Sequence, residues 1–181
     1  MGGQVLGVKS SADRYGAVAI AIHWVSAAAI IGLLISGTVA EGTEGAGKAS
    51  ILIVHAAVGT LVMLLTLARV AWWLWADKRP APLAGQPAAQ ELLARAVHGL
   101  LYLAIFVLTL SGIATLALSG AVPALLGQGP LPDFSTVAPR FVHGLVSKLM
   151  LALVAVHTLA ALYHQFIRRD RLLGRMGIGS I

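Results

Sequence analysis

The histidines are the residues whose type and spacing could support chemistry in this chain. Five lie inside long stretches with very few charges and a sixth lies at the end of one: His23, His55, His98, His143, His157 and, at the end, His164. His143 and His157 are fourteen residues apart, which in an α-helix is about 21 Å and about 40° short of four turns, so both side chains face the same way. No cysteine is present, which excludes disulfides, iron–sulfur clusters, cysteine-based zinc sites and thiol catalysis.

The stretches around the histidines are long enough to cross a membrane. The chain has 181 residues, of which 58% are hydrophobic and 11% are charged, and its mean hydropathy is +0.86. A soluble chain carries about a quarter charged residues, and about 20 apolar residues make one spanning helix. We therefore predict an all-α, four-helix transmembrane bundle in lipid over residues 15–168, flanked by an N-terminal segment (1–14) and a basic tail (169–181), with helices at about 15–40, 50–76, 93–119 and 140–167.

The positions of Lys and Arg predict the orientation of the bundle. Ten of the 13 flank the N-terminus, the connection between the second and third helices, or the C-terminus, and only Lys48, Arg140 and Lys148 lie toward the opposite end. By the positive-inside rule, both termini are cytoplasmic. The net charge of +6 is not arranged as a basic stripe with interleaved aromatic residues, so nucleic acid is not expected as a partner.

In this orientation four histidines fall at two depths. His55 and His143, the outer pair, lie in the outer leaflet, and His23 and His157, the inner pair, lie in the inner leaflet. Zinc requires three or four protein ligands, whereas a six-coordinate haem iron takes two opposed imidazoles. We predict two b-type haems, bound non-covalently because no Cys-x-x-Cys-His motif is present. The alternative is that each histidine only forms a hydrogen bond with a neighbouring helix.

Other residues fall where a haem edge or a quinone would lie. Arg69 is at the depth of the inner pair and would bind a haem propionate, unless it only extends to the membrane interface. His98 and His164 could contact a propionate or a quinone, and His164 could equally be a solvated residue at a helix end. Gly59 and Gly112 leave space for a macrocycle, although helix packing explains them just as well.

Several motifs follow one another in order along the four helices: Ile22-His23-Trp24, the pair His55 and Arg69, Val97-His98-Gly99, and the spacings from His143 to His157 and from His157 to His164. Together they resemble the bacterial cytochrome b561 family over roughly Arg14 to Met176. The resemblance implies an inner-membrane dihaem cytochrome b that exchanges electrons with a quinone, with the outer and inner pairs as iron ligands. Within the family the chain is most similar to the superoxide-oxidising type, which takes electrons from superoxide at the outer face and reduces ubiquinone.

The outer end carries the cations that such a reaction would use. Lys48, Arg140 and Lys148 all lie within seven residues of an outer-pair histidine, and cations near a haem edge would attract the superoxide anion. Lys148 lies inside a span and therefore requires a partner, such as a propionate or a bound anion, unless its side chain extends to the outer interface. Arg140 could contact a propionate or simply begin its helix, and Lys48 could simply be a solvated loop residue. Glu41 and Glu44 would repel an anion if they lie near the same entrance.

Two other functions remain open. The chain could be an electron-transfer subunit that anchors a hydrogenase, a dehydrogenase or a periplasmic redox protein to the quinone pool, in which case it would co-purify with that partner. A superoxide:quinone oxidoreductase would instead be active alone. A haem-free transporter or scaffold is disfavoured, because the sequence shows no broken span and no buried carboxylate that would mark an ion pathway.

Overall fold

Four long helices dominate the computed structural model, which describes residues 7–82 and 85–179. They are α1 (Ala17–Glu41), α2 (Gly45–Ala71), α3 (Ala88–Leu118) and α5 (Ala138–Leu162). Short elements complete the described residues: π-helical turns that extend α2 (Trp72–Ala76) and α5 (Tyr163–Arg168), a 3₁₀ turn (Phe134–Thr136), α4 (Val122–Leu125) and α6 (Leu172–Arg175). No β-strand occurs in these ranges. The predicted all-α fold is confirmed.

Each long helix is long and apolar enough to cross a membrane. With their π-helical extensions, the four candidate spans are Ala17–Glu41, Gly45–Ala76, Ala88–Leu118 and Ala138–Arg168, of 25, 32, 31 and 31 residues. At about 1.5 Å per residue, each exceeds the thickness of the hydrocarbon core, which is about 30 Å. The predicted four-span bundle is therefore confirmed as the architecture of this chain.

Two helices begin earlier than the charge pattern predicts. α2 begins at Gly45 rather than near residue 50, and α3 begins at Ala88 rather than near residue 93. Pro87 precedes the first turn of α3, and Glu91 lies within that turn, where a carboxylate favours the positive end of the helix dipole. Charged residues mark where a helix leaves the hydrocarbon, and the hydrogen-bonded helix continues past that boundary.

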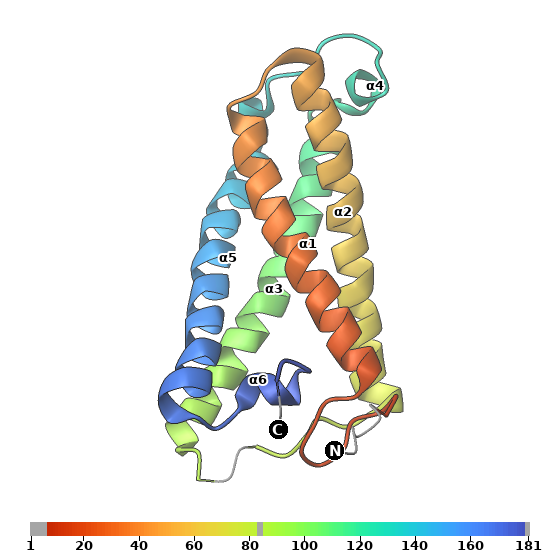
Figure 1. Ribbon diagram of the computed structural model, residues 1–181. Helices are drawn as coiled ribbons and strands as arrows, with labels where there is room; N and C mark the ends of the chain where they lie inside the picture. Colours follow the sequence, from red (N-terminus) through yellow and green to blue (C-terminus); the bar gives the residue numbers. More distant parts are fainter. Residues whose placement is uncertain (1–6, 83–84, 180–181) are drawn as a thin grey trace.

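The bundle consists of two helical hairpins. α1 packs against α2, and α3 packs against α5, while α2 and α3 form the contact between the hairpins. Figure 1 shows α4 at the end of the bundle where α1 joins α2, and α6 at the opposite end, between the lower ends of α5 and α1. The segments that lead into α1 and out of α5 lie at the same end as α6.

The buried core lies midway along the bundle. Its cluster of buried side chains comes from α2, α3 and α5: Val62, Ala104, Ile105, Met150 and Leu153. Met150 is 1% exposed, and it lies seven residues from His143 and seven from His157 along α5. An apolar layer therefore separates the level of the outer pair from the level of the inner pair.

The end that carries α6 is joined by hydrogen bonds between distant segments. Arg175 donates to the carbonyl oxygens of Asp13 and Ala81 at 2.9 and 2.7 Å, and Trp24 Nε1 donates to the carbonyl of Met176 at 2.9 Å. Asp77 accepts from the backbone N–H and the hydroxyl of Ser10. These bonds hold the N-terminal segment, the connection from α2 to α3 and the C-terminal segment together at the base of the bundle.

Candidate haem sites

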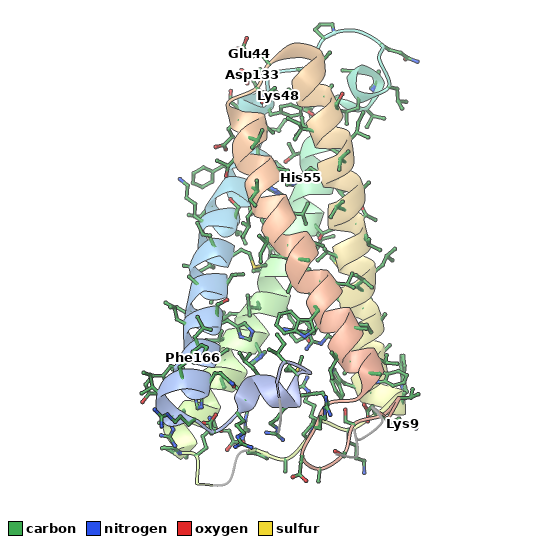
Figure 2. All side chains as sticks on the ribbon, viewed as in Figure 1. Lys9, Glu44, Lys48, His55, Asp133 and Phe166 are labelled. Carbon is green, nitrogen blue, oxygen red and sulfur yellow. The ribbon has the colours of Figure 1, made fainter. Side chains whose placement is uncertain are left out.

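The structure brings the outer and inner pairs together as the depth argument predicts. His55 on α2 and His143 on α5 have ring centroids 6.1 Å apart with an interplanar angle of 61°. His23 on α1 and His157 on α5 have centroids 6.2 Å apart at 63°. Figure 2 shows His55 in the half of the bundle nearest α4. α5 thus contributes one imidazole at each of two levels, and the hairpin of α1 and α2 contributes the other.

These centroid distances fit one metal ion between each pair of rings. An imidazole nitrogen binds a transition metal at about 2.0 Å, and the ring centroid lies about 1.1 Å beyond it, so two opposed imidazoles on one iron have centroids about 6.2 Å apart. The described ranges contain no group of three or more His, Asp or Glu residues able to hold a bare metal ion. Two ligands per level suit haem iron, because the porphyrin supplies the remaining four.

The outer pair has hydrogen-bond partners that leave one ring nitrogen free. Nδ1 of His55 lies 2.9 Å from the hydroxyl of Ser36. Nδ1 of His143 lies 3.2 Å from the hydroxyl of Ser111 and 3.0 Å from the carbonyl oxygen of Leu108. Metal-binding histidines usually hold their second nitrogen in this way. Sequence reasoning did not find the two serines, although each is followed by glycine in a long helix, and this repeated dipeptide was an available signal.

Arg69 lies at the inner pair, at the depth expected from the sequence. Its Nη1 is 3.3 Å from Nδ1 of His23, and its Nε is buried with no hydrogen-bond partner among the described residues. A guanidinium group only donates hydrogen bonds, so a buried N–H without an acceptor favours a nearby anion. A haem propionate at this level would supply that acceptor, and the residues present therefore fit a haem.

Comparison with known proteins identifies the family of this bundle. The prokaryotic cytochrome b561 model matches residues 14–179. The chain belongs to the prokaryotic cytochrome b561 family. It is 31% identical to "Cytochrome b561 homolog 2" of Escherichia coli (strain K12), with 91% of each chain covered. It is 29% identical to "Cytochrome b562" of Cereibacter sphaeroides, over 90% of this chain and 94% of that one. No solved structure matches.

Family membership makes this protein a multi-pass membrane b-type cytochrome that transfers electrons, and b-type haem is the group that its histidines would bind.

His98 lies beside the inner pair of this cytochrome b561. Its ring centroid is 5.1 Å from that of His157, shorter than the roughly 6.2 Å that two opposed imidazoles on one iron require. His23 therefore fits better than His98 as the partner of His157.

His164 is held at the end of the span by an acidic residue that sequence reasoning missed. Its Nδ1 lies 2.5 Å from Oδ2 of Asp170, and its side chain is 12% exposed. Arg168 Nε lies 3.9 Å from the same carboxylate oxygen. The sequence offered little warning, because Asp170 stands in a run of arginines beyond the helix. His164 in this cytochrome b561 is thus neither a free helix-end residue nor an unpaired base.

The three outer cations have different surroundings. Arg140 Nη2 lies 2.7 Å from Oε1 of Glu41, which joins the start of α5 to the end of α1. Lys148 is exposed on α5 and has no hydrogen bond or ion pair within the described part of the chain. Lys48 lies near Glu44 at the same end of the bundle (Figure 2). The predicted roles of these residues in attracting an anion stay predictions, and Glu41 partly offsets the charge of Arg140.

Proposed function

We propose that this cytochrome moves electrons across the bacterial inner membrane through two haem b groups, from superoxide at the periplasmic face to ubiquinone. The observation that carries the proposal is the presence of two imidazole pairs, with centroid separations of 6.1 and 6.2 Å, at two levels of one bundle. His143 and His157 are about 21 Å apart along α5, so the two levels together reach across most of the hydrocarbon core.

The reaction balances without another reactant. Two superoxide anions are oxidised to two O₂, and one ubiquinone takes up the two electrons and two protons to become ubiquinol. A haem b between two imidazoles supplies a one-electron iron couple. In this chain the outer and inner pairs would hold the two irons, and Arg69 would hold a propionate through its unpartnered Nε.

The end near His164 suits the uptake of protons by a quinone. The carboxylate of Asp170 accepts from Nδ1–H of His164, so Nε2 faces away from Asp170. When the ring carries its second proton, Nε2 donates a hydrogen bond to a quinone carbonyl and can pass that proton to it. His98, beside the inner pair, is the second candidate for a propionate or quinone contact. The clustering of Lys and Arg at this end of the bundle supports its placement on the cytoplasmic side.

A second function is favoured by the acidic residues at the other end. Glu41 forms an ion pair with Arg140, and Glu44 lies at the same end (Figure 2), so the net attraction for a small anion is reduced. A periplasmic redox protein or an associated dehydrogenase or hydrogenase would then be the electron donor in place of superoxide.

Superoxide-driven reduction of ubiquinone by the purified chain separates the two functions. Haem content and a reduced-minus-oxidised spectrum come first, and we expect two b haems per chain. Reduction of ubiquinone by the chain alone would support the oxidoreductase. A fully haem-loaded chain that is inactive with superoxide, but accepts electrons from a co-purified protein, would contradict it and support the subunit function.

A further inference from the structure

Two Ser-Gly dipeptides occupy equivalent places in the two hairpins. Ser36-Gly37 lies on α1 and faces His55 of α2, while Ser111-Gly112 lies on α3 and faces His143 of α5. In each hairpin, the earlier helix carries the dipeptide and the later helix carries the histidine. The same local arrangement therefore surrounds both histidines of the outer pair.

The hydrogen bonds of the serines determine which nitrogen of each ring carries a proton. Ser36 donates its only hydroxyl proton to the carbonyl of Leu33 at 3.1 Å, so its oxygen is left to accept a bond from Nδ1–H of His55. Ser111 donates to the carbonyl of Val107 at 2.6 Å and likewise accepts from His143. With the proton on Nδ1, the lone pair of Nε2 is free to bind iron.

The glycines give the rings room against the helix backbone. A Cβ on Gly112 would lie 3.3 Å from Cε1 and 3.4 Å from Nδ1 of His143, which is tighter than most real contacts. A Cβ on Gly37 would lie 3.6 Å from Cε1 of His55, an ordinary contact distance. Gly112 is therefore the more restrictive of the two positions.

We propose that these dipeptides position the two histidines of the outer pair as haem ligands. The serine hydroxyl fixes the tautomer of the imidazole, and the glycine fixes the position of its ring. The inference rests on the proposed binding of haem by the outer pair. A hydrogen bond accepted from Nδ1–H makes the imidazole a stronger donor to iron and so stabilises the ferric state. Ser36 and Ser111 are thus positioning residues that lower the reduction potential of the outer haem and leave the inner haem unaffected.

The two serines differ in whether another hydrogen-bond acceptor remains for the histidine when the hydroxyl is removed. In Ser111→Ala, the carbonyl of Leu108 still lies 3.0 Å from Nδ1 of His143. In Ser36→Ala, no other hydrogen-bond acceptor for Nδ1 of His55 is found among the described residues. We therefore expect a larger upward shift of the outer potential for Ser36→Ala than for Ser111→Ala, and near-wild-type behaviour for Ser36→Thr, which keeps the hydroxyl.

The test is a potentiometric titration of the purified full chain, with the haem content of each variant measured in parallel. The matched control is Ser147→Ala, since Ser147 lies on α5, the helix of His143, and donates only to a carbonyl of its own helix, that of Gly144. The transition that disappears in His143→Ala identifies the outer haem. An upward shift of the potential of that transition alone would support the proposal, provided that the shift is largest in Ser36→Ala, smaller in Ser111→Ala and absent in Ser147→Ala.

Unchanged potentials in Ser36→Ala, or an equal shift in Ser147→Ala, would overturn it. If the serine variants fold poorly, the glycines provide a second test. Gly112→Ala should weaken binding of the outer haem by about 10- to 100-fold, the usual effect of disturbing a ligand's support. Gly32→Ala, with nothing within 4 Å of the added carbon, should have no effect, and equal haem content in the two would contradict the proposal. A wild-type chain without two haems would instead refute the proposed function.

Discussion

At the scale of single residues, the candidate ligands differ in what their second ring nitrogen meets. In the outer pair Nδ1 faces a hydroxyl oxygen, whereas Nδ1 of His23 in the inner pair lies 3.3 Å from the guanidinium of Arg69. An acceptor for Nδ1–H strengthens the imidazole as a ligand, whereas the positive charge of a nearby guanidinium disfavours the ferric state of the iron by electrostatic repulsion. This difference predicts a lower potential for the outer haem, so electrons would flow downhill from the outer to the inner level.

Replacing His143 with alanine removes one imidazole of the outer pair and leaves the inner pair intact. We expect the haem content to fall from two per chain to one, with the spectrum of the inner haem retained. Haem extraction and the reduced-minus-oxidised spectrum measure this. Retention of both haems would contradict the pairing of His143 with His55.

Replacing Arg69 with glutamine removes the cation beside His23 while keeping a polar side chain. Because the cation disfavours ferric iron, its loss should lower the potential of the inner haem by on the order of tens of millivolts and leave the outer haem unchanged. Potentiometric titration tests this. Arg95→Gln is the control, since Arg95 is exposed and forms an ion pair with Glu91; an equal shift there would show that the effect is not local.

At the scale of elements, α5 is the long helix that contributes to both pairs. It contributes one histidine to each pair, and Met150 lies between them in the buried core. The face of α5 that holds the histidines therefore also holds the apolar contact that separates the two levels. The π-helical turn beyond α5 adds His164, whose partner Asp170 follows the end of the turn.

Met150→Ala should destabilise the bundle by leaving a cavity between α5 and its neighbours. We expect the free energy of unfolding to fall by about 2 kcal/mol, the lower end of the range for replacing a buried Met with Ala. The loss is small because lipid already solvates apolar side chains in the unfolded reference state. Thermal loss of the haem spectrum measures it. Leu151→Ala is the matched control, since Leu151 is 58% exposed on the same helix; equal destabilisation by both changes would argue against a packed central layer.

The ionisation of Asp77 should make the contacts at the base of the bundle depend on pH. Partial burial alone would raise the pKa of Asp77, but hydrogen bonds from Ser10, from the backbone of Lys78 and from Trp72 lower it below its ordinary value of 3.8. Because the pKa of Asp77 is lower in the folded chain than in the unfolded chain, its ionised carboxylate stabilises the fold fully at pH values above the ordinary pKa of 3.8. This stabilisation is lost as the pH falls through the lower pKa of the folded chain.

Acid should therefore release the N-terminal segment from the end of α2, and limited proteolysis across this acidic range measures the release. Asp77→Asn should already be more susceptible at neutral pH and should show less additional change on acidification. A wild-type chain that resists cleavage throughout this range as it does at neutral pH would contradict the assigned role of Asp77.

At the scale of the whole molecule, the two ends of the bundle carry different charge. The base, with the N-terminal segment, the connection from α2 to α3 and the C-terminal segment, holds ten of the 13 basic residues. The opposite end holds three cations, of which Arg140 forms an ion pair with Glu41. If the donor is superoxide, this ion pair controls how much positive charge faces it.

Glu41→Gln should free the charge of Arg140 and accelerate superoxide-driven quinone reduction at low ionic strength by about two- to fivefold, a small part of what charge steering can supply. Arg140→Gln should slow the reaction, and both effects should shrink in high salt. The initial rate at two salt concentrations tests this. Glu91→Gln, at the base, serves as the control and should leave the rate unchanged. Unchanged rates in Glu41→Gln and Arg140→Gln as well would contradict superoxide as the donor.

The sequence by itself determined the four spans and the depth of each histidine, because hydropathy and the helical repeat are properties of a local stretch of chain. The fourteen-residue interval from His143 to His157 needs only the pitch of one helix. Only the tertiary structure decided the contacts of Ser36, Ser111 and Asp170, and the pairing of Arg140 with Glu41. Such contacts depend on how one helix is rotated and shifted against another, and a difference of one residue in that register, about 100° around the axis, directs a side chain to a different neighbour.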